Sequence, residues 1–262
     1  MLRVSGADAL TYLQSQISQD IRGLGDGGTT YTFVLQPTGK VEALARLHRV
    51  NAEEFLIDTE AGFGAALTTR LNRFKIRVKV DVEPLDWRLI AVRGTDVAPA
   101  GSLPAWGRAD AHDLLGEAPT PPDGVRHGST AELEAMRIEA GWPAMGAEIT
   151  DTTIPAETGV VPLAVNFTKG CYPGQELVER MDSRGSNAPR FVRRLRGEGS
   201  VAPGAVVTHE GKEVGTLTSV ADSDEGWSAL ASIARAVQPG ESVSVATGTG
   251  PIDAAVEELV LR

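Results

Sequence analysis

The chain has 262 residues, 42% hydrophobic and 23% charged, which is ordinary for a globular protein with a sizeable core. Its formal net charge of −10 argues against a dedicated nucleic-acid binder, because such a protein needs a basic face. The single cysteine excludes an intramolecular disulfide framework. Neither a signal peptide nor a membrane-spanning stretch is predicted, so we expect a cytoplasmic protein without a membrane partner.

The first 83 residues show clear helical and strand patterns. Ser5 followed by Asp8 predicts a capping box, and apolar residues at helical spacing predict a helix that ends at the glycine-rich stretch 23–28. Strands are predicted over 31–35 and 41–50, joined by a turn at 37–40, and a short third strand over 55–57. An amphipathic helix is predicted over 63–74. Strict alternation over 76–82 then predicts a half-buried strand.

The pattern weakens between 84 and 128. One apolar strand at 89–92 is followed by a Pro/Gly-rich stretch, which predicts a loop or linker and not a compact unit. Thr130 is predicted to be the N-cap of a helix that ends at Gly141. From residue 190 onward, recurring short apolar segments predict a small closed or nearly closed antiparallel barrel. These segments are 191–195, 214–220, 228–233, 243–246 and 255–261.

The segment 169–176 holds the only cysteine of the chain. A cysteine is nucleophilic or metal-binding only as a thiolate, which a nearby cation favours, and Lys169 lies two residues before Cys171. The glycines around Cys171 permit close approach of backbone and ligand. Two interpretations are open: a structural loop with an incidental cysteine, or a reactive thiol. The density of glycine, proline and charged residues around Cys171 favours the reactive thiol.

Two common kinds of cysteine site are disfavoured. A hydrolase needs a histidine base that a third group orients, and none of the four histidines stands in a catalytic signature. These are His48, His112, His127 and His209. A zinc site or a permanent iron–sulfur cluster needs about four nitrogen or sulfur ligands, so no metal site is predicted from one thiol.

A second group of charged residues stands at 137–143 and 153–157. Arg137 can pair with a ligand carboxylate, and a glutamate of this group, Glu139 or Glu157, can accept the N–H donors of an aminopyrimidine. A solvated helix face followed by a surface loop explains the same pattern equally well.

Taken together, these residues resemble the YgfZ-type folate-binding proteins, relatives of the glycine-cleavage T-protein (aminomethyltransferase). The family hallmark Lys-Gly-Cys-Tyr-x-Gly-Gln-Glu stands at 169–176, with proline at the variable position. Its residues are Lys169, Gly170, Cys171, Tyr172, Gly174, Gln175 and Glu176. Further matches stand at 6–9, 13–14, 20–21, 39–40, 137–141 and 155–157, and the match is weakest between about 95 and 128.

The resemblance implies an α+β, T-protein-like multidomain fold with a C-terminal antiparallel β-barrel. The implied domains are an N-terminal part of the folate-binding region at 1–83, a second α+β segment at 84–187, and the barrel at 188–262. A tetrahydrofolate or a one-carbon derivative would bind in a central cavity, with Arg137 and Glu157 as contacts.

The implied function is assembly or repair of iron–sulfur clusters in client enzymes. The implied partners are the folate and iron–sulfur client enzymes or assembly proteins, and the chain is expected to act as a monomer. On the matching positions, Cys171 is the functional thiol.

One departure separates the chain from the T-proteins. They carry a catalytic aspartate a few residues after the glycine that stands here at Gly39, where this chain has Ala43 and Leu44. Without that carboxylate, aminomethyl transfer is disfavoured, so an accessory protein is expected and not a classical enzyme. A folate-dependent one-carbon transferase is the alternative, and a scaffold that no longer binds folate is a third possibility.

Overall fold

A computed structural model describes residues 1–262 except 96, 184–187, 224–225 and 260–262. The chain divides into two compact units: unit 1 comprises Met1–Val125 with Val161–Arg180, and unit 2 comprises Arg126–Val160 with Met181–Arg262. The division into domains at 1–83, 84–187 and 188–262 stays a prediction.

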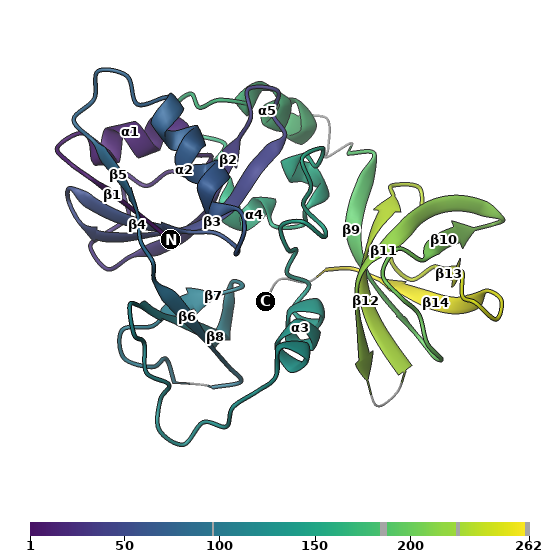
Figure 1. Ribbon diagram of the computed structural model, residues 1–262. Helices are drawn as coiled ribbons and strands as arrows, with labels where there is room; N and C mark the ends of the chain where they lie inside the picture. Colours follow the sequence, from purple (N-terminus) through teal and green to yellow (C-terminus); the bar gives the residue numbers. More distant parts are fainter. Residues whose placement is uncertain (96, 184–187, 224–225, 260–262) are drawn as a thin grey trace. The chain divides into compact units, whose positions relative to one another are not determined.

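Unit 1 is built around an antiparallel sheet with the strand order β2-β3-β4-β1-β5 (Figure 1). The strands are β1 (Leu2–Ser5), β2 (Thr29–Leu35), β3 (Val41–Asn51), β4 (Glu54–Asp58) and β5 (Asp81–Pro84). The strands predicted at 31–35, 41–50 and 55–57 are confirmed. β1 was not predicted because its four residues are too few to show a period.

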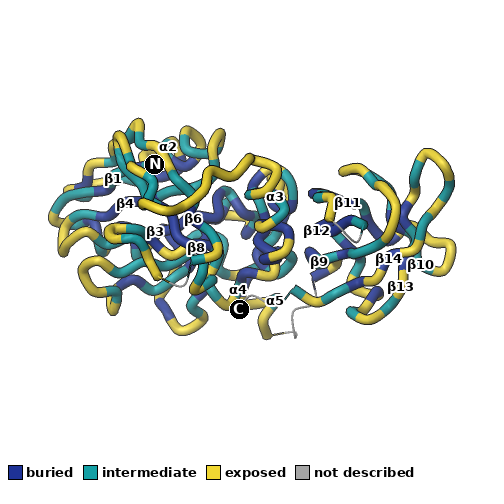
Figure 2. The backbone as a smooth tube through the Cα atoms, turned by 90° about the horizontal axis from the view of Figure 1, so that it is seen from below, coloured by how far each residue is buried: buried dark blue, intermediate teal, exposed yellow. Residues whose placement is uncertain are grey.

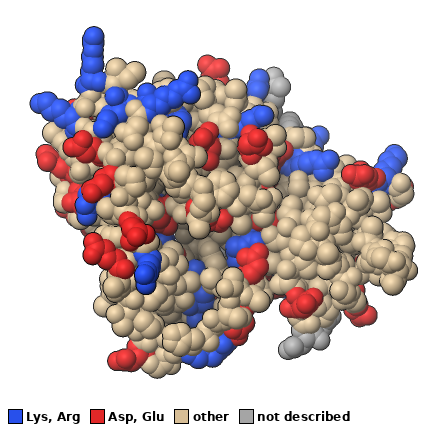
Figure 3. All heavy atoms as spheres, in the orientation of Figure 1, with Lys and Arg blue, Asp and Glu red and all other residues tan. Residues whose placement is uncertain are grey.

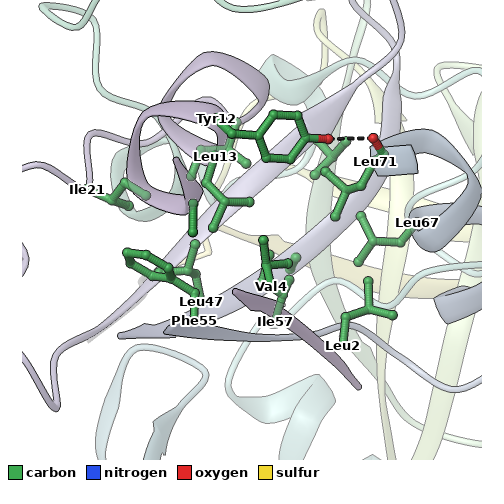
Figure 4. Close-up of a cluster of buried hydrophobic side chains, with 14 of the residues drawn as sticks. Leu2, Val4, Tyr12, Leu13, Ile21, Leu47, Phe55, Ile57, Leu67 and Leu71 are labelled. Carbon is green, nitrogen blue, oxygen red and sulfur yellow. Dashed lines mark hydrogen bonds between the residues drawn. The ribbon is translucent and has the colours of Figure 1, made fainter. Parts of the chain in front are cut away.

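Helices α1 (Ala9–Gln16) and α2 (Gly64–Arg73) pack on one face of this sheet and close the core of unit 1. Leu13 of α1 and Leu71 of α2 are fully buried there together with Phe55 of the sheet (Figure 4). The Tyr12 hydroxyl donates a hydrogen bond to the Leu71 carbonyl, which ties the two helices together. The amphipathic helix predicted at 63–74 is confirmed.

The start of α1 differs from the prediction. Ser5 is the last residue of β1, so the predicted capping box with Asp8 is wrong. The Asp8 carboxylate instead accepts the backbone N–H of Lys79 at 2.8 Å, far along the chain. A long-range backbone partner of this kind leaves no local pattern in the sequence.

A second small sheet of unit 1 has the order β6-β8-β7 and corrects the linker predicted between 84 and 128. Its strands are β6 (Arg88–Arg93), β7 (Leu103–Ala105) and β8 (Arg108–Gly116). Trp106 and Gly107 join β7 to β8 with φ of +53° and +66°, the positive values that a tight hairpin turn requires. Because charged residues are spread along β8, the apolar alternation expected of a strand is missing there.

Unit 2 begins with helix α3 (Thr130–Glu139). Its N-cap is Ser129 and not the predicted Thr130. The Ser129 Oγ accepts the Glu132 backbone N–H at 3.1 Å, and the Glu132 carboxylate accepts the Ser129 N–H at 2.7 Å. This reciprocal capping box fixes the first turn of the helix.

A closed barrel with the strand order β10-β11-β12-β9-β14-β13 forms the C-terminal part of unit 2, which confirms the predicted antiparallel barrel. The strands are β9 (Arg190–Gly197), β10 (Val206–His209), β11 (Lys212–Ser223), β12 (Gly226–Ala234), β13 (Ser242–Val245) and β14 (Ile252–Glu257). Inward residues such as Leu217, Trp227 and Val245 are buried, and buried positions recur along the strands in Figure 2. Residues 260 and 261 of the last predicted segment lie outside the described residues.

No helix in the described part of the chain is both long enough and apolar enough to cross a membrane.

Candidate functional site

The segment with the only cysteine connects two helices, α4 (Val161–Ala164) and α5 (Gln175–Ser183). Helix α4 is held beside β2 through Ser18, whose Oγ donates to the Ala164 carbonyl at 2.6 Å and accepts the N–H of Phe33 in β2 at 2.8 Å. The backbone N–H of Asn166 donates to the Ser18 carbonyl at 3.0 Å, and the Asn166 side chain accepts the Thr168 N–H at 2.9 Å. These contacts define where residues 169–174, here called the signature loop, leave the body of unit 1.

Lys169 anchors the signature loop to helix α1. Its side chain is buried, and its Nζ donates to the carbonyl oxygens of Gln14, at 2.6 Å, and of Ile17. These carbonyls lie at the C-terminal end of α1, where helix carbonyls lack intrahelical partners and a cation is favourable. Burial lowers the pKa of Lys169 to about 8, with an opposing contribution from Asp20. The ammonium predicted to stabilise the Cys171 thiolate is thus engaged with a helix end.

Tyr172 closes the other side of the loop. Its ring is buried and lies 4.9 Å from the Lys169 Nζ, in cation–π contact. Burial raises the pKa of Tyr172 to about 12. Its backbone N–H donates to the Gln175 Oε1 at 3.2 Å, and its carbonyl accepts the Gln175 N–H at 3.3 Å. Gln175 therefore fixes the turn that precedes α5.

Two glycines bring the signature loop against the β2–β3 hairpin. Gly174 has φ +84°, and a Cβ placed on it would lie 2.6 Å from the Gln36 carbonyl oxygen and 3.0 Å from the Gly39 Cα. Gly39 has φ +85°, and a Cβ placed on it would lie 2.5 Å from the Leu177 Cβ of α5. Both positions require glycine because they combine left-handed backbone with close contact. The matches at 39–40 and 169–176, far apart in the sequence, thus form one structural feature.

Cys171 lies on the outer side of this anchored loop and is exposed as a free thiol. Gly170 beside it has open space around it, with no atom within 4 Å of a Cβ placed there. Phe167, two residues before the loop, is 39% exposed. The arrangement presents a thiol that a partner molecule can reach, on a loop whose two ends are fixed by buried groups.

Arg137, the predicted folate contact, is buried in unit 2 and fully hydrogen-bonded. Its Nε and Nη2 pair with the Glu134 carboxylate, and its Nη1 donates to the Glu148 Oε2 at 2.9 Å and to the Trp142 carbonyl. A further bond from Nη2 reaches the Ser219 Oγ at 2.6 Å. Within the described residues, each of its five N–H donors therefore has a protein partner.

Glu148 is the centre of this network. Its side chain has no exposed surface, and its Oε1 accepts hydroxyl groups of Thr218 and Ser219 at 2.5 and 2.7 Å. Its Oε2 accepts the Ala144 N–H at 2.9 Å in addition to Arg137. A register shift in β11 between Leu217 and Ser219 brings both hydroxyls to the same carboxylate. Sequence reasoning missed Glu148, which stands alone in a turn-rich stretch.

Glu157, the other predicted folate contact, ends the short 3₁₀ helix Pro155–Glu157. Its Oε2 accepts the Ile154 backbone N–H at 3.0 Å, so it has a capping role. Burial raises the pKa of Glu157, and Arg190 acts in the opposite direction. Among the described residues Oε1 accepts no hydrogen bond. Glu157 thus keeps one oxygen available to a ligand, whereas all five N–H donors of Arg137 are engaged with protein groups.

A buried charge cluster in unit 1 was also missed from the sequence. Arg46 of β3 pairs with both carboxylate oxygens of Asp58, at 3.0 and 3.1 Å, and with Asp113 of β8 at 2.8 Å. Asp113 also accepts from Arg93, whose guanidinium lies 3.9 Å from the Trp106 ring. Burial raises the pKa of Asp58, against the effect of Arg46. The two guanidinium groups, of Arg46 and Arg93, balance the charge of the two carboxylates and connect the two sheets of unit 1. We therefore interpret this cluster as structural.

No group of three or more His, Cys, Asp or Glu side chains suited to a metal ion is found among the residues that the structure describes.

Comparison with known proteins places these features in a family. No protein-family model matches the chain. It is 30% identical over 234 residues to an uncharacterized protein of Haemophilus influenzae, which covers 86% of this chain and 82% of that protein. It is 28% identical over 259 residues to a tRNA-modifying protein YgfZ of an Enterobacter species, covering 85% and 79%.

One further relative and one solved structure extend the comparison. The iron–sulfur cluster assembly factor IBA57 homolog of Pyricularia oryzae, a mitochondrial protein, is 30% identical over 269 residues, or 92% of this chain and 65% of that protein. The crystal structure of the glycine cleavage system aminomethyltransferase T from Bartonella henselae matches with a TM-score of 0.84 and 19% identity, over 98% of this chain and 82% of that one. The chain belongs to the YgfZ-type family.

The predicted family and fold class are therefore confirmed. The YgfZ-type chain has the α+β fold of the aminomethyltransferase, including a closed antiparallel barrel. In this fold Ala43 and Leu44 are both buried in β3, opposite Val34 and Phe33 of β2. Neither can supply a carboxylate at the position where the T-proteins carry their aspartate.

Proposed function

We propose that this YgfZ-type protein is an accessory protein for the assembly or repair of iron–sulfur clusters in client enzymes, with Cys171 as its functional thiol. The observation that carries the proposal is the exposed thiol on a loop anchored at Lys169, Tyr172 and Gly174. The name of the fungal relative, an iron–sulfur cluster assembly factor, supports the same role. We place the protein in the cytoplasm as a monomer, with client enzymes or assembly proteins as partners.

The chemistry open to one exposed thiol is transient. As a thiolate it can bind iron at the edge of a cluster that a partner holds. It can also attack a disulfide of a partner, so that a new Cys171–partner disulfide forms and the second partner sulfur leaves as a thiolate. A permanent cluster needs about four thiolates, and the chain contains one cysteine. Cys171 therefore exchanges with a partner and does not retain a cluster.

Binding of tetrahydrofolate or a one-carbon derivative is the second part of the proposal. The predicted contacts fit such a ligand only in part. Arg137 can bind a folate carboxylate only by giving up one of its present partners. Glu157 has Oε1 for an N–H donor of the ligand while Oε2 keeps its cap on Ile154.

Restoration of iron–sulfur enzymes tests the proposal as a whole. In a bacterial strain that lacks its own YgfZ-type protein, expression of this chain is expected to raise the activity of at least some iron–sulfur enzymes well above the empty-vector level. Enzymes without a cluster, assayed in the same extracts, are the control and should not change. If no iron–sulfur enzyme gains activity although the chain is present and soluble, the proposed function is wrong.

A calorimetric titration with tetrahydrofolate tests the ligand. We expect binding, and Glu157→Gln is expected to weaken it about tenfold, which corresponds to one lost hydrogen bond to a charged group. A glutamine keeps one oxygen for the Ile154 N–H, so the cap survives. Glu139→Gln, an equal change in charge, is the control. Absence of binding heat would favour the scaffold, and turnover of a methylene- or methyltetrahydrofolate would favour the transferase.

A further inference from the structure

An acid-free basic stretch stands out in this acidic chain. Between residues 61 and 80 there is no aspartate or glutamate, and cations accumulate toward its end, although the formal net charge is −10. The cations are Arg70, Arg73, Lys75, Arg77 and Lys79. In Figure 3, basic side chains gather at the upper left, over the connection from α2 to β5. Because acidic residues dominate the composition, a local excess of cations of this size calls for an explanation.

Most of these cations lack a carboxylate partner. Arg73, Arg77 and Lys79 are exposed, and none forms an ion pair within the described residues. Lys75 lies 4.0 Å from Asp81, whose own side chain is 92% exposed, so this contact is long and hydrated. Arg70 is buried and belongs to the core side of α2. The exposed charges are thus available to an external anionic group.

The backbone of this stretch departs from the strand that its alternating sequence predicts. Instead of a strand over 76–82, β5 begins only at Asp81, and Arg77 has φ +55°, a value that is uncommon for residues other than glycine. Val78 and Val80 still pack on the core of unit 1, but Ile76 is 71% exposed. Places where a consistent sequence pattern is not followed are commonly functional. Here the departure puts an apolar side chain among the cations.

Both ends of the stretch are fixed. At the start, the Phe74 ring contacts the Arg70 and Arg73 guanidinium groups at 3.9 and 5.8 Å. At the end, Lys79 donates its N–H to the Asp8 carboxylate, and its carbonyl lies 2.2 Å from a Cβ placed on Gly6, where only glycine fits. The exposed cations and Ile76 are therefore held in a defined arrangement, which lowers the entropy lost on binding.

We propose that this basic surface, formed by Arg73, Lys75, Ile76, Arg77 and Lys79, docks an acidic segment of a partner protein that carries an apolar side chain for Ile76. Charge complementarity identifies the acidic character of the partner. The exposed aliphatic side chain identifies a protein, since an isoleucine neither stacks on a base nor hydrogen-bonds to one, and Phe74 is already covered by two arginines. This surface is additional to the proposed function at Cys171 and does not depend on it.

The limited extent of the basic surface also favours a short acidic protein segment over a nucleic acid. Electrostatic interactions are screened over about 8 Å at physiological ionic strength. A long nucleic acid would extend past the basic surface onto the acidic body of the chain, where it is repelled. The negative charge of a short acidic protein segment, by contrast, can lie entirely opposite the exposed cations.

The test uses labelled peptides and fluorescence anisotropy with the full chain. The probe is a peptide of six glutamates around one leucine, and the comparison probes are the same peptide with serine for leucine and a single-stranded oligouridylate of equal charge. We expect the leucine peptide to bind most tightly, and its binding to weaken as salt is added. Arg77→Glu should weaken it about tenfold and Ile76→Ser about fivefold. Lys212→Glu changes the net charge by the same amount at an exposed barrel position and should leave binding nearly unchanged.

Several outcomes would overturn the proposal. Equal loss for Arg77→Glu and Lys212→Glu would mean that only the overall charge acts. Tighter binding of the oligouridylate would assign the surface to nucleic acid. Dimerisation of the chain alone, abolished by Arg77→Glu in sedimentation, would assign it to a second copy. No binding of the leucine peptide at about 1 mM would exclude docking of this kind. Because Ile76→Ser and Arg77→Glu alter exposed side chains, circular dichroism can confirm that both variants fold.

Discussion

Glu148→Gln is expected to lower the free energy of unfolding by about 3 to 5 kcal/mol, the range found when one partner of a buried ion pair is removed. Glu148 accepts bonds from Arg137, the Ala144 N–H and two hydroxyls of β11, and its side chain has no exposed surface. A glutamine amide would turn an N–H toward one of these donors. It would also leave the buried Arg137 guanidinium without the negative charge that balances it.

Urea unfolding at neutral pH measures this effect, and Glu139→Gln supplies the matched control. Glu139 has the same chemistry and pairs with Arg194 and Arg196, but its side chain is 43% exposed. Surface ion pairs contribute about 0 to 1 kcal/mol. The control variant should therefore lower the free energy of unfolding by less than about 1 kcal/mol. If both variants lost the same amount, or if Glu148→Gln lost under about 1 kcal/mol, the account of Glu148 as the buried centre of the network would be wrong.

The elements predicted correctly from the sequence are those with a strong local pattern. The strands at 41–50 and 228–233 are rich in buried apolar residues, and the amphipathic helix at 63–74 buries one face, so each shows its apolar pattern locally. The strand β8 was missed because Asp110 and Asp113 pair with arginines and interrupt its apolar alternation. The capping box at Ser5 failed because Asp8 binds the backbone of Lys79, which lies 71 residues away. At these aspartates the local structure is determined by the hydrogen-bond and ion-pair partners, which the local sequence pattern does not reveal.

In the candidate site, too, local features could be predicted from the sequence and long-range contacts could not. Cys171 and its glycines could be found from the sequence, since a lone thiol in a turn-forming segment is a local signal. The role of Lys169 could not, because its partners are the backbone carbonyls of Gln14 and Ile17, more than 150 residues earlier. Likewise, the saturation of Arg137 depends on Ser219, 82 residues away in the barrel. Residue types were predictable, whereas the partners that use up their donors were not.

Cys171→Ser is expected to remove the function while leaving the fold intact. The thiol is exposed, so replacement of sulfur by oxygen should change the free energy of unfolding by no more than about 0.5 kcal/mol. A hydroxyl, however, is not ionised near neutral pH and neither binds iron as a thiolate does nor exchanges with disulfides. Function and stability should therefore separate completely at this residue. Gly170→Ala is the control, because open space surrounds Gly170 and the thiol beside it is kept.

The most direct test of this account is the activity of iron–sulfur enzymes in cells whose only YgfZ-type protein is the wild-type chain, Cys171→Ser or Gly170→Ala, each present at the same level. We predict that Gly170→Ala restores the enzymes to the wild-type level and that Cys171→Ser leaves them at the level of cells without the protein. Full enzyme activity with Cys171→Ser would contradict the central claim that the exposed thiol is the functional group.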